Sequence, residues 1–317
     1  MSNIHSVTPD ISVLLSVFNE EKYIVDTITS VLDQTYENFE LIIIDDASTD
    51  NTLEILKSFN DTRINIFTNN RNIGLTKSLN IGLGKCRGRY IARIDSDDIM
   101  VKERLQKQFD YLKNNPHVTV IGCYVHVIDE NKNKIAKGHW PCGIENTFFY
   151  SICGKNPLGH PAVMMQKIAV SNVNNYSEEF LYSQDYDLWL RLLLNGYLID
   201  NIPEYLTYYR DTANNSVEKK QEQELYHHKA FFNYVNVLTN KKIKSTTSDR
   251  YLDCLIFNDN NNTFLDSLFV VRTFNFLLSN IAIEIMVEID RKIYNKMFFN
   301  DFKIQSRLLK FFYNHRQ

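Results

Sequence analysis

Apolar, strand-like runs alternate with helical segments through the first third of this 317-residue chain. The predicted strands cover 11–17, 39–44, 64–68 and 90–94. The helical segments between and after them cover 20–32, 53–59, 75–86 and 101–114. Strands that are apolar throughout are typical of a parallel sheet that is covered by helices on both faces. We therefore expect an α/β fold with a Rossmann-like, mainly parallel sheet.

The pattern changes after residue 115. Residues 118–137 predict a β-hairpin that turns at 130–133, and residues 138–161 predict a loop with one short helix. Further predicted elements are an amphipathic helix over 185–194, a pair of strands over 198–209 and helices from 218 onward. We place a domain boundary near residue 217, with one domain over 1–217 and a helical C-terminal extension over 218–317.

The charge and the cysteines exclude several classes of protein. The net charge is -3, whereas a nucleic-acid-binding protein usually carries a basic excess, so we expect no nucleic-acid partner. The five cysteines are scattered without the spacing of a zinc site, which indicates reduced thiols in a cytoplasmic protein. The polar N-terminus predicts no secretory signal, and no uncharged apolar run reaches about 18 residues, so no membrane span is expected.

Three carboxylates, Asp95, Asp97 and Asp98, directly follow the fourth predicted strand. Open parallel sheets bind ligands beyond the carboxyl ends of their strands. Carboxylates two positions apart on a loop can point into one cleft, where a hard divalent cation such as Mg2+ or Mn2+ would find the oxygen ligands it prefers. Alternatively, Asp97 or Asp98 caps the helix that starts near Val101. One carboxylate would suffice for a cap, and three in four residues repel one another, so we predict a cation site with Asp98 capping alongside it.

The second predicted strand also ends in acids, Asp45 and Asp46, and the first ends at Phe18-Asn19-Glu20. Asp46 could accept hydrogen bonds from a nucleobase or a ribose hydroxyl. The alternative is a loop held by Asx-type turns. Asp50 is expected to cap the next helix.

Asp185 stands at the start of the amphipathic helix over 185–194. A carboxylate at that position is favoured by the helix dipole, which is the structural explanation. The functional explanation is a general base within hydrogen-bonding reach of an acceptor hydroxyl. Asp187 lies two positions further on and faces another direction, so we expect only one of the two to reach a substrate.

Several basic residues and one histidine are weaker candidates. His160 could bind a metal or a phosphate, although a single histidine is more often structural. Arg71 and Lys77 flank Asn72-Ile73-Gly74 and could meet a phosphate or a base, or be solvated surface charges. The basic, Phe-rich C-terminal segment could lie on an anionic membrane surface or be a solvated face.

Five motifs together resemble family 2 glycosyltransferases in order and spacing over about residues 10–217. They are ISVLLSVFNE (11–20), LIIIDDASTD (41–50), NIG (72–74), ARIDSDD (92–98) and DYDLWLR (185–191). The resemblance implies a GT-A fold, with nucleotide-sugar binding over about 10–115 and acceptor binding over about 116–217. It also implies an inverting transferase that uses a nucleotide sugar, usually a UDP-sugar, with Mn2+ or Mg2+.

The same motifs imply roles for individual residues. Phe18, Asn19 and Glu20 would line the nucleotide site, and Asp46 would meet the uracil. Asp97 would bind the metal, Asp95 would lie near the ribose and the metal, and Asp185 would be the base. Further residues assigned to the nucleotide-sugar site are Val17, Arg71, Lys77, Arg93 and Ser96, and secondary candidates are His160, Asp187, Arg191 and Arg210.

Two positions depart from the family pattern. Gln184 replaces a Glu that commonly precedes the base, and Thr212 replaces a His that helps many members hold pyrophosphate or metal. The third metal ligand is therefore open.

The implied reaction gives a β-linked product in bacterial O-antigen, capsule or related polysaccharide synthesis. The acceptor would be a saccharide or lipid-linked saccharide, and the protein would be cytoplasmic or peripheral on the inner face of the membrane. Alternatives are a nucleotide-sugar hydrolase, a nucleotidyltransferase, a phosphoacceptor domain around Asp45-Asp46, and a non-catalytic binding scaffold.

Overall fold

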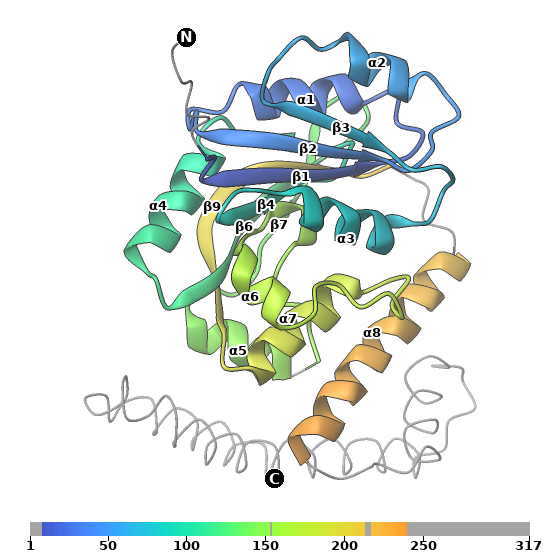
Figure 1. Cartoon of the computed structure of the whole chain (residues 1–317). Helices are drawn as coiled ribbons and strands as arrows, with labels where there is room; N and C mark the ends of the chain where they lie inside the picture. The colour runs from blue at the N-terminus through green and yellow to red at the C-terminus, as the bar shows by residue number, and fades with distance from the viewer. Residues whose placement is uncertain (1–7, 153, 213–216, 240–317) are drawn as a thin grey trace. The chain divides into compact units, whose positions relative to one another are not determined.

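The computed structural model describes residues 8–152, 154–212 and 217–239 (Figure 1). The chain divides into two compact units, Met1–Tyr234 and Val235–Gln317, and the fold described below belongs to the first. The basic C-terminal segment that could meet a membrane lies outside the described residues. Within them, no helix combines the length and apolarity that crossing a membrane requires.

The N-terminal half confirms the predicted alternation of strands and helices. Its elements are β1 (Ile11–Val17), α1 (Ile24–Leu32), β2 (Phe39–Asp45), α2 (Thr52–Ser58), β3 (Ile64–Thr68), α3 (Leu75–Lys85) and β4 (Tyr90–Arg93). β1 pairs in parallel with β2 and β4, and β2 pairs in parallel with β3. The carboxyl ends of β1, β2 and β4 therefore lie at one edge of the sheet, as the sequence predicted.

Helix α1 begins four residues later than the sequence pattern predicted, at Ile24 rather than Glu20. The backbone N–H of Glu20 donates to Thr52 Oγ1, and that of Glu21 donates to Asp50 Oδ2. These bonds to the neighbouring loop hold the segment outside the helix. Asp50 also accepts a hydrogen bond from the N–H of Thr52, the first residue of α2. The N-cap residue itself is Asn51, without a side-chain cap bond, so Asp50 lies one residue before the position that the sequence analysis gave it.

The C-terminal half adds two long strands, three short ones and four further α-helices before α8. They are β5 (Ile99–Met100), α4 (Arg104–Asn114), β6 (Val118–Ile128), β7 (Lys134–Gly138), α5 (Ile144–Ile152), a 3-10 turn (His160–Ala162), β8 (Met164–Gln166), α6 (Lys167–Asn172), α7 (Gln184–Leu194), β9 (Leu198–Arg210) and α8 (Val217–Thr239). The β6–β7 hairpin is confirmed.

The expected strand pair over 198–209 is wrong, because β9 is one continuous strand of 13 residues. It pairs in parallel with β6 from Leu198 to Arg210, with register shifts around Tyr124. The described strands form a nine-stranded sheet in the order β3-β2-β1-β4-β8-β6-β9-β5, with β7 beside β6. The register with β6 passes from Ile202 to Tyr205, so Pro203 lies at a shift in the pairing while the strand continues.

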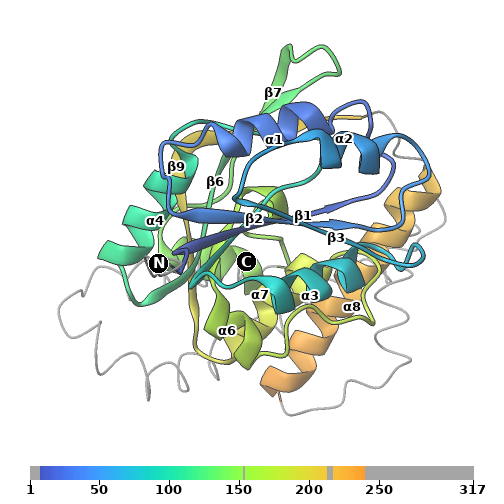
Figure 2. The ribbon, with the colours of Figure 1, turned by 45° about the horizontal axis from the view of Figure 1, so that its top comes forward.

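Two apolar layers cover the N-terminal part of the sheet (Figure 2). On one face, α1, α2 and α4 bury Ile28, Leu56 and Leu105 among the core residues of the strands. On the other face, α3, α6 and α7 pack against residues such as Leu14 and Ile42, which alternate with the first set along the strands. Burial on both faces explains why β1 and β2 are mostly apolar.

Candidate active site

The loop between β4 and β5 carries the acid run, and helix α1 fixes its backbone. Thr27 Oγ1 lies 2.9 Å from the carbonyl oxygen of Ser96 and 2.7 Å from that of Asp98. A buried hydroxyl on α1 therefore sets the conformation of the loop, and Asp95 and Asp97 stay partly exposed at the sheet edge.

Asp98 does not cap a helix, so that prediction is wrong. β5 follows it and pairs with β9, and α4 begins only at Arg104, without a side-chain cap. Asp98 is fully buried, and its Oδ1 accepts the backbone N–H of Arg210 at 2.9 Å. Burial, with Asp95 and Asp97 nearby, raises the pKa of Asp98 well above its ordinary value. Asp98 thus joins the loop to the end of β9.

Negative charge accumulates where the loops after β1 and β4 meet. Burial and the charge of Asp95 raise the pKa of Asp97 to about 6. Burial, then Asp97, Asp95 and Asp50, raise the pKa of Glu20 to about 7. Carboxylates that raise one another's pKa values form a site that a cation would stabilise.

This acid site fits a divalent cation only with open positions for other ligands. In the described part of the chain, no three acid, histidine or cysteine side chains are arranged to hold a metal together. Asp98 Oδ2 is buried and has no hydrogen-bond partner among the described residues. Two carboxylates plus diphosphate and water oxygens would suit Mg2+ or Mn2+, which usually keep several non-protein ligands.

Arg93 lies beneath the acid loop and is only 1% exposed. Its guanidinium forms an ion pair with Asp95, while Nε and Nη1 are buried without a hydrogen-bond partner among the described residues. Its positive charge also opposes the rise in the pKa values of Asp97 and Asp185 that burial causes. The sequence assigned Arg93 to the nucleotide-sugar site, and the structure connects it to the acid loop through Asp95.

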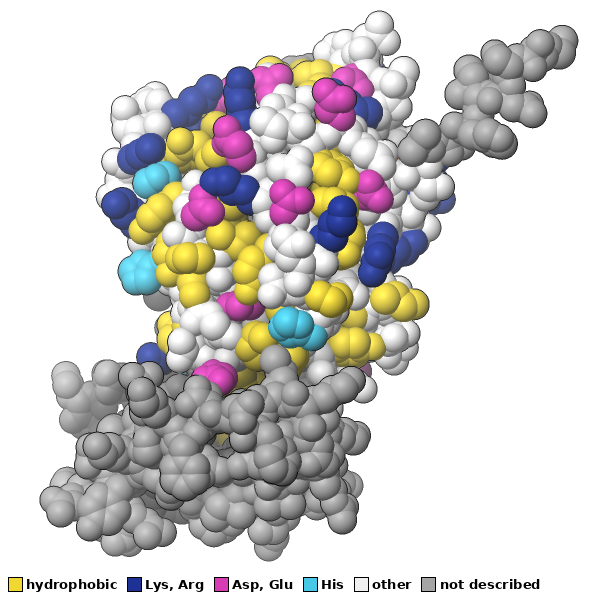
Figure 3. Space-filling model, turned by 90° about the vertical axis from the view of Figure 1, so that its left-hand side faces the viewer, with side chains coloured by type: hydrophobic (Ala, Val, Ile, Leu, Met, Phe, Trp, Pro, Cys, Tyr) yellow, Lys and Arg dark blue, Asp and Glu magenta, His cyan; other side chains and the backbone are white. Residues whose placement is uncertain are grey.

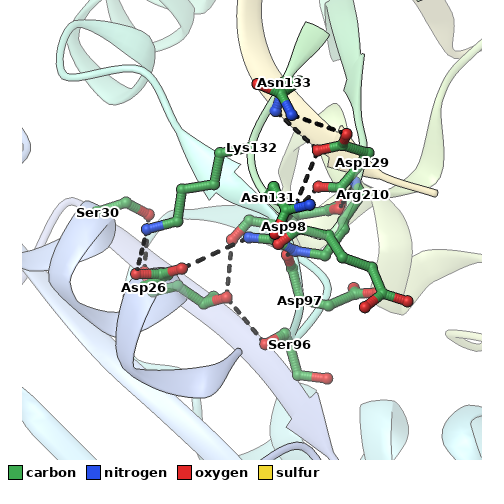
Figure 4. A network of polar contacts seen from close by, with 12 residues as sticks. Asp26, Ser30, Ser96, Asp97, Asp98, Asp129, Asn131, Lys132, Asn133 and Arg210 are labelled. Carbon is green, nitrogen blue, oxygen red and sulfur yellow. Dashed lines mark hydrogen bonds and ion pairs between the residues drawn. The ribbon is translucent and has the colours of Figure 1, made fainter. Parts of the chain in front are cut away.

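Arg210 braces the acid loop from the end of β9 (Figure 4). Its Nε donates to the carbonyl oxygen of Asp97 at 2.9 Å, and its Nη1 donates to those of Asp129 and Glu130 at 3.2 and 3.1 Å. The guanidinium also lies over the ring of Tyr23, 4.4 Å from its centroid. The sequence made Arg210 a secondary site candidate. Its side chain is buried and contacts the acid loop through the backbone carbonyl of Asp97.

Asp46 holds the loop that leads into α3. Its Oδ1 accepts hydrogen bonds from Asn69 Nδ2 and the backbone N–H of Ile73, and its Oδ2 accepts the N–H of Gly74. Gly74 has a φ of 90°, a conformation that favours glycine. The loop-holding alternative is thus observed, and Asp46 is only 3% exposed. Arg71 and Lys77, on the same segment, are exposed.

The loop after β1 presents one aromatic ring to solvent. Phe18 is 42% exposed, whereas the Val17 side chain is buried, so Val17 reaches this edge only through its backbone. Asn19 has a φ of 55° and its Oδ1 accepts the N–H of Thr49 at 2.8 Å. Phe18 is therefore the exposed apolar side chain at this corner, where the nucleotide was expected.

Asp185 lies in the first turn of α7, separate from the acid loop. Its Oδ2 accepts a hydrogen bond from Asn156 Nδ2 at 2.8 Å. Burial raises the pKa of Asp185, and the bonds from Asn156 and the charge of Arg93 oppose that rise. Asp187 instead forms an ion pair with Arg191 at 2.8 Å. The two acids of the helix thus have different partners, and Asp187 and Arg191 neutralise each other.

His160 is enclosed by aromatic rings. Its Nε2 lies 2.9 Å from the hydroxyl of Tyr176, and its ring packs edge-on against those of Tyr176 and Trp189. Burial and the charge of Arg93 lower the pKa of His160 well below its ordinary value. The imidazole is therefore neutral at pH 7, and the structural explanation of His160 fits these contacts.

The sequence analysis missed two residues that shape the site, Thr27 and Asn156. Thr27 is buried in α1, and Asn156 lies 29 residues before the acid that it contacts. No local pattern marks either residue, because each acts through a contact between segments that are distant in the chain.

A mainly parallel sheet with an acid loop at its carboxyl edge and a second buried acid beyond it defines the class of GT-A glycosyltransferases. The family model of glycosyl transferase family 2 matches residues 12–174. An uncharacterized glycosyltransferase of Haemophilus influenzae is 32% identical over 296 residues, 89% of this chain and 87% of that protein. The chain belongs to glycosyl transferase family 2.

Other relatives carry more specific names. The O-antigen biosynthesis glycosyltransferase WbnJ of Escherichia coli is 34% identical over 253 residues, 77% of this chain and 93% of WbnJ. The E. coli UDP-Glc:alpha-D-GlcNAc-diphosphoundecaprenol beta-1,3-glucosyltransferase WfgD is 33% identical over 183 residues, 58% of this chain and 69% of WfgD.

Solved structures show the same fold. S. aureus TarS 1-349 in complex with UDP-GlcNAc has a TM-score of 0.59 and 18% identity, over 86% of this chain and 81% of that one. The mannosyltransferase PcManGT from Pyrobaculum calidifontis, in complex with GDP-Man and Mn2+, has a TM-score of 0.55 and 12% identity. The match covers 90% of this chain and 76% of that one. The expected GT-A fold is thereby confirmed.

Proposed function

We propose that this glycosyltransferase inverts the anomeric centre of a UDP-sugar and forms a β-glycosidic bond to an acceptor hydroxyl. The observation that carries the proposal is the separation of two acid sites: the loop of Asp95 and Asp97, and the buried Asp185. Arg93 acts on the pKa values of acids in both sites, so it lies within electrostatic reach of each. That arrangement suits a donor on one side and an acceptor on the other.

The donor side would be built from the loops after β1, β2 and β4. Phe18, Asn19 and Glu20 would line the nucleotide, with Asp46 at the uracil and Asp95 at the ribose. Arg71, Lys77 and Ser96 are further candidates for donor contacts. The UDP-sugar is supported by relatives and neighbours whose names include UDP-Glc and UDP-GlcNAc.

A divalent cation, Mn2+ or Mg2+, would bind at Asp97 with Asp95 as the second protein ligand. Bound there, it would neutralise charge on the departing diphosphate. The raised pKa values of Asp97 and Glu20 support this placement, because they mark negative charge that the described side chains do not balance. Arg210 would keep Asp97 in place through its backbone carbonyl.

Asp185 would act as the general base. Burial raises its pKa, which makes the carboxylate a better proton acceptor than an exposed aspartate. The acceptor oxygen would attack the anomeric carbon as the bond to the diphosphate breaks and the hydroxyl proton moves to Asp185. A single displacement converts an α-linked donor into a β-linked product. The transition state would have oxocarbenium character, by analogy with glycoside hydrolysis.

The acceptor would be a saccharide or a lipid-linked saccharide in bacterial polysaccharide synthesis. Relatives named for O-antigen biosynthesis and for a diphosphoundecaprenol-linked acceptor support this class. In this proposal, residues from about 10 to 115 form the donor-binding half and residues from about 116 to 217 form the acceptor-binding half. Residues 218–317 form an extension. The protein would work in the cytoplasm, with peripheral contact to the inner face of the membrane through the extension.

A donor screen by thermal unfolding tests this proposal. A UDP-sugar at about 100 times its dissociation constant should stabilise the protein by about 2.7 kcal/mol, and only in the presence of Mn2+ or Mg2+. Asp97→Asn should abolish the metal-dependent part of the shift. Metal-independent binding, or release of free sugar without an acceptor at the rate of transfer, would contradict the proposal.

A further inference from the structure

We infer that Asn156 is a positioning residue for Asp185 and that helix α8 holds this pair together, which makes α8 part of the acceptor site. The inference rests on the proposed function, in which Asp185 is the base. Helix α8 begins at Val217, beyond residues 12–174 that the family model matches. It also follows the last of the five family motifs, which ends at residue 191.

The amide of Asn156 is held in one orientation. Its Oδ1 accepts the backbone N–H of Leu158 at 3.3 Å, so its Nδ2 faces Asp185 and donates to Oδ2 at 2.8 Å. This bond occupies Oδ2 of a carboxylate on which backbone hydrogen bonds at Asp185 and Tyr186 also act. In the proposed role, the acceptor proton would pass to the other oxygen, Oδ1. A hydrogen bond to the ionised form also favours that form, which is the one that a base needs.

Helix α8 contacts both segments that carry the pair. Ser183 Oγ donates to the carbonyl oxygen of Gln223 at 3.1 Å, and His227 Nε2 donates to the carbonyl oxygen of Gly154 at 2.8 Å. Ser183 directly precedes α7 and Gly154 lies two residues before Asn156. Helix α8 therefore connects the turn that starts the Asp185 helix to the turn that presents Asn156.

Both of these turns have left-handed backbone conformations. The φ angles are 55° at Ser183 and 75° at Gly154. A non-glycine residue such as Ser183 adopts this conformation at a free-energy cost, and it persists when its surroundings hold it in place. The bonds to α8 supply that support.

Ring packing adds a second contact between α8 and the site. The His227 ring stacks on the Tyr186 ring, with centroids 4.2 Å apart and planes 7° from parallel. Tyr186 follows Asp185 in the chain, and its hydroxyl donates to the carbonyl oxygen of Ser151 at 3.0 Å. His227 thus contacts the residue next to the base as well as the loop of Asn156.

The test measures kcat, donor KM and the pH dependence of kcat for Asn156→Ala. Near Asp185 lie Arg93 from β4 and Tyr176 from the loop before α7, which interact with it electrostatically, and Tyr186 with its stacking partner His227. All of them remain in the variant. We expect kcat to fall about 10- to 100-fold, with donor KM unchanged. The acidic limb of the kcat profile should move to higher pH, because the ionised form loses a hydrogen bond.

Two further variants keep the test decisive. Asn156→Asp preserves the side-chain volume and adds a like charge, so it should move the acidic limb further in the same direction. Asn172→Ala is the matched control. It also removes a hydrogen bond that an asparagine side chain donates, but this bond is exposed and goes to the hydroxyl of Tyr197. The control should leave kcat and its pH profile unchanged.

The role of α8 is tested with His227→Phe, which keeps a ring against Tyr186 and removes the hydrogen bond to Gly154. It should lower kcat about 10-fold, with the donor-induced thermal shift intact. His228→Phe makes the same substitution at the next position and should have no such effect. Equal behaviour of the two variants would overturn the role of α8.

Asp185→Asn separates the failure of this inference from that of the proposed function. If Asp185→Asn transfers sugar at the full rate, the base assignment itself is wrong. If Asp185→Asn is inactive while Asn156→Ala keeps the wild-type kcat and pH profile, only the positioning role of Asn156 is overturned.

Discussion

Glu20 and Asp97 are partly exposed carboxyl groups of the site whose pKa values are raised. Their pKa values rise to about 7 and about 6, because burial and neighbouring carboxylates disfavour the ionised forms. Each group therefore binds a proton more strongly in the folded protein than in the unfolded chain. A metal ion bound beside them would favour the ionised forms and reverse this preference.

The pH dependence of stability follows from these shifts. A carboxyl whose pKa rises from 4.5 to about 7 on folding contributes stability at low pH, and that contribution is lost as the pH rises through this range. We expect Glu20 and Asp97 to raise the melting temperature of the metal-free protein at about pH 5 relative to that at about pH 7.5. Glu20→Gln should reduce the difference, and the exposed Glu54→Gln on α2 should not. Equal pH dependence in both variants would contradict the assignment.

Residue types at the sheet edge could be predicted from the sequence, but their partners could not. Asp95, Asp97 and Asp185 stand out because acids directly after apolar strands or at a helix start are local features. Arg210 and Asp98, by contrast, meet across 112 positions of the chain. The capping role predicted for Asp98 was wrong because a local rule cannot anticipate a strand that arrives from so far away.

At the scale of elements, the parallel half of the fold is encoded locally and the second half is not. Strands β1 to β4 consist mostly of apolar residues, so their pattern alone predicts them. Strands β5 and β8 contain two and three residues, too few for a periodic pattern. Strand β9 owes its continuity to β6, so the sequence divided it into two.

Close packing of α3 on β1 gives a prediction about this parallel half. A Cβ atom at Gly82 would lie 2.3 Å from Leu14 Cδ1, whereas at Gly84 it would have no neighbour within 4 Å. We expect Gly82→Ala to destabilise the protein by about 1–3 kcal/mol, because Leu14 must move within a packed core. Gly84→Ala should be neutral or stabilising by up to about 1 kcal/mol. Urea unfolding of both variants measures this, and equal stabilities would contradict the packing.

At the scale of the whole molecule, one unit holds both acid sites in a single sheet and its covering helices. The surface over α4 and the neighbouring strands shows basic, acidic and hydrophobic side chains interspersed (Figure 3). The described surface in this view therefore carries no extended patch of one charge.

We propose that the acid loop of Asp95 and Asp97 binds the donor and the metal, whereas Asp185 is the base. The transfer rate of Asp185→Asn tests this assignment most directly. The variant should show the same metal-dependent donor shift as the wild-type protein, because Asp185 lies outside the donor loops. Its kcat, measured with saturating UDP-sugar, Mn2+ and acceptor, should fall at least about 100-fold, since it lacks the base. A folded Asp185→Asn protein that transfers sugar at the wild-type rate would contradict the account.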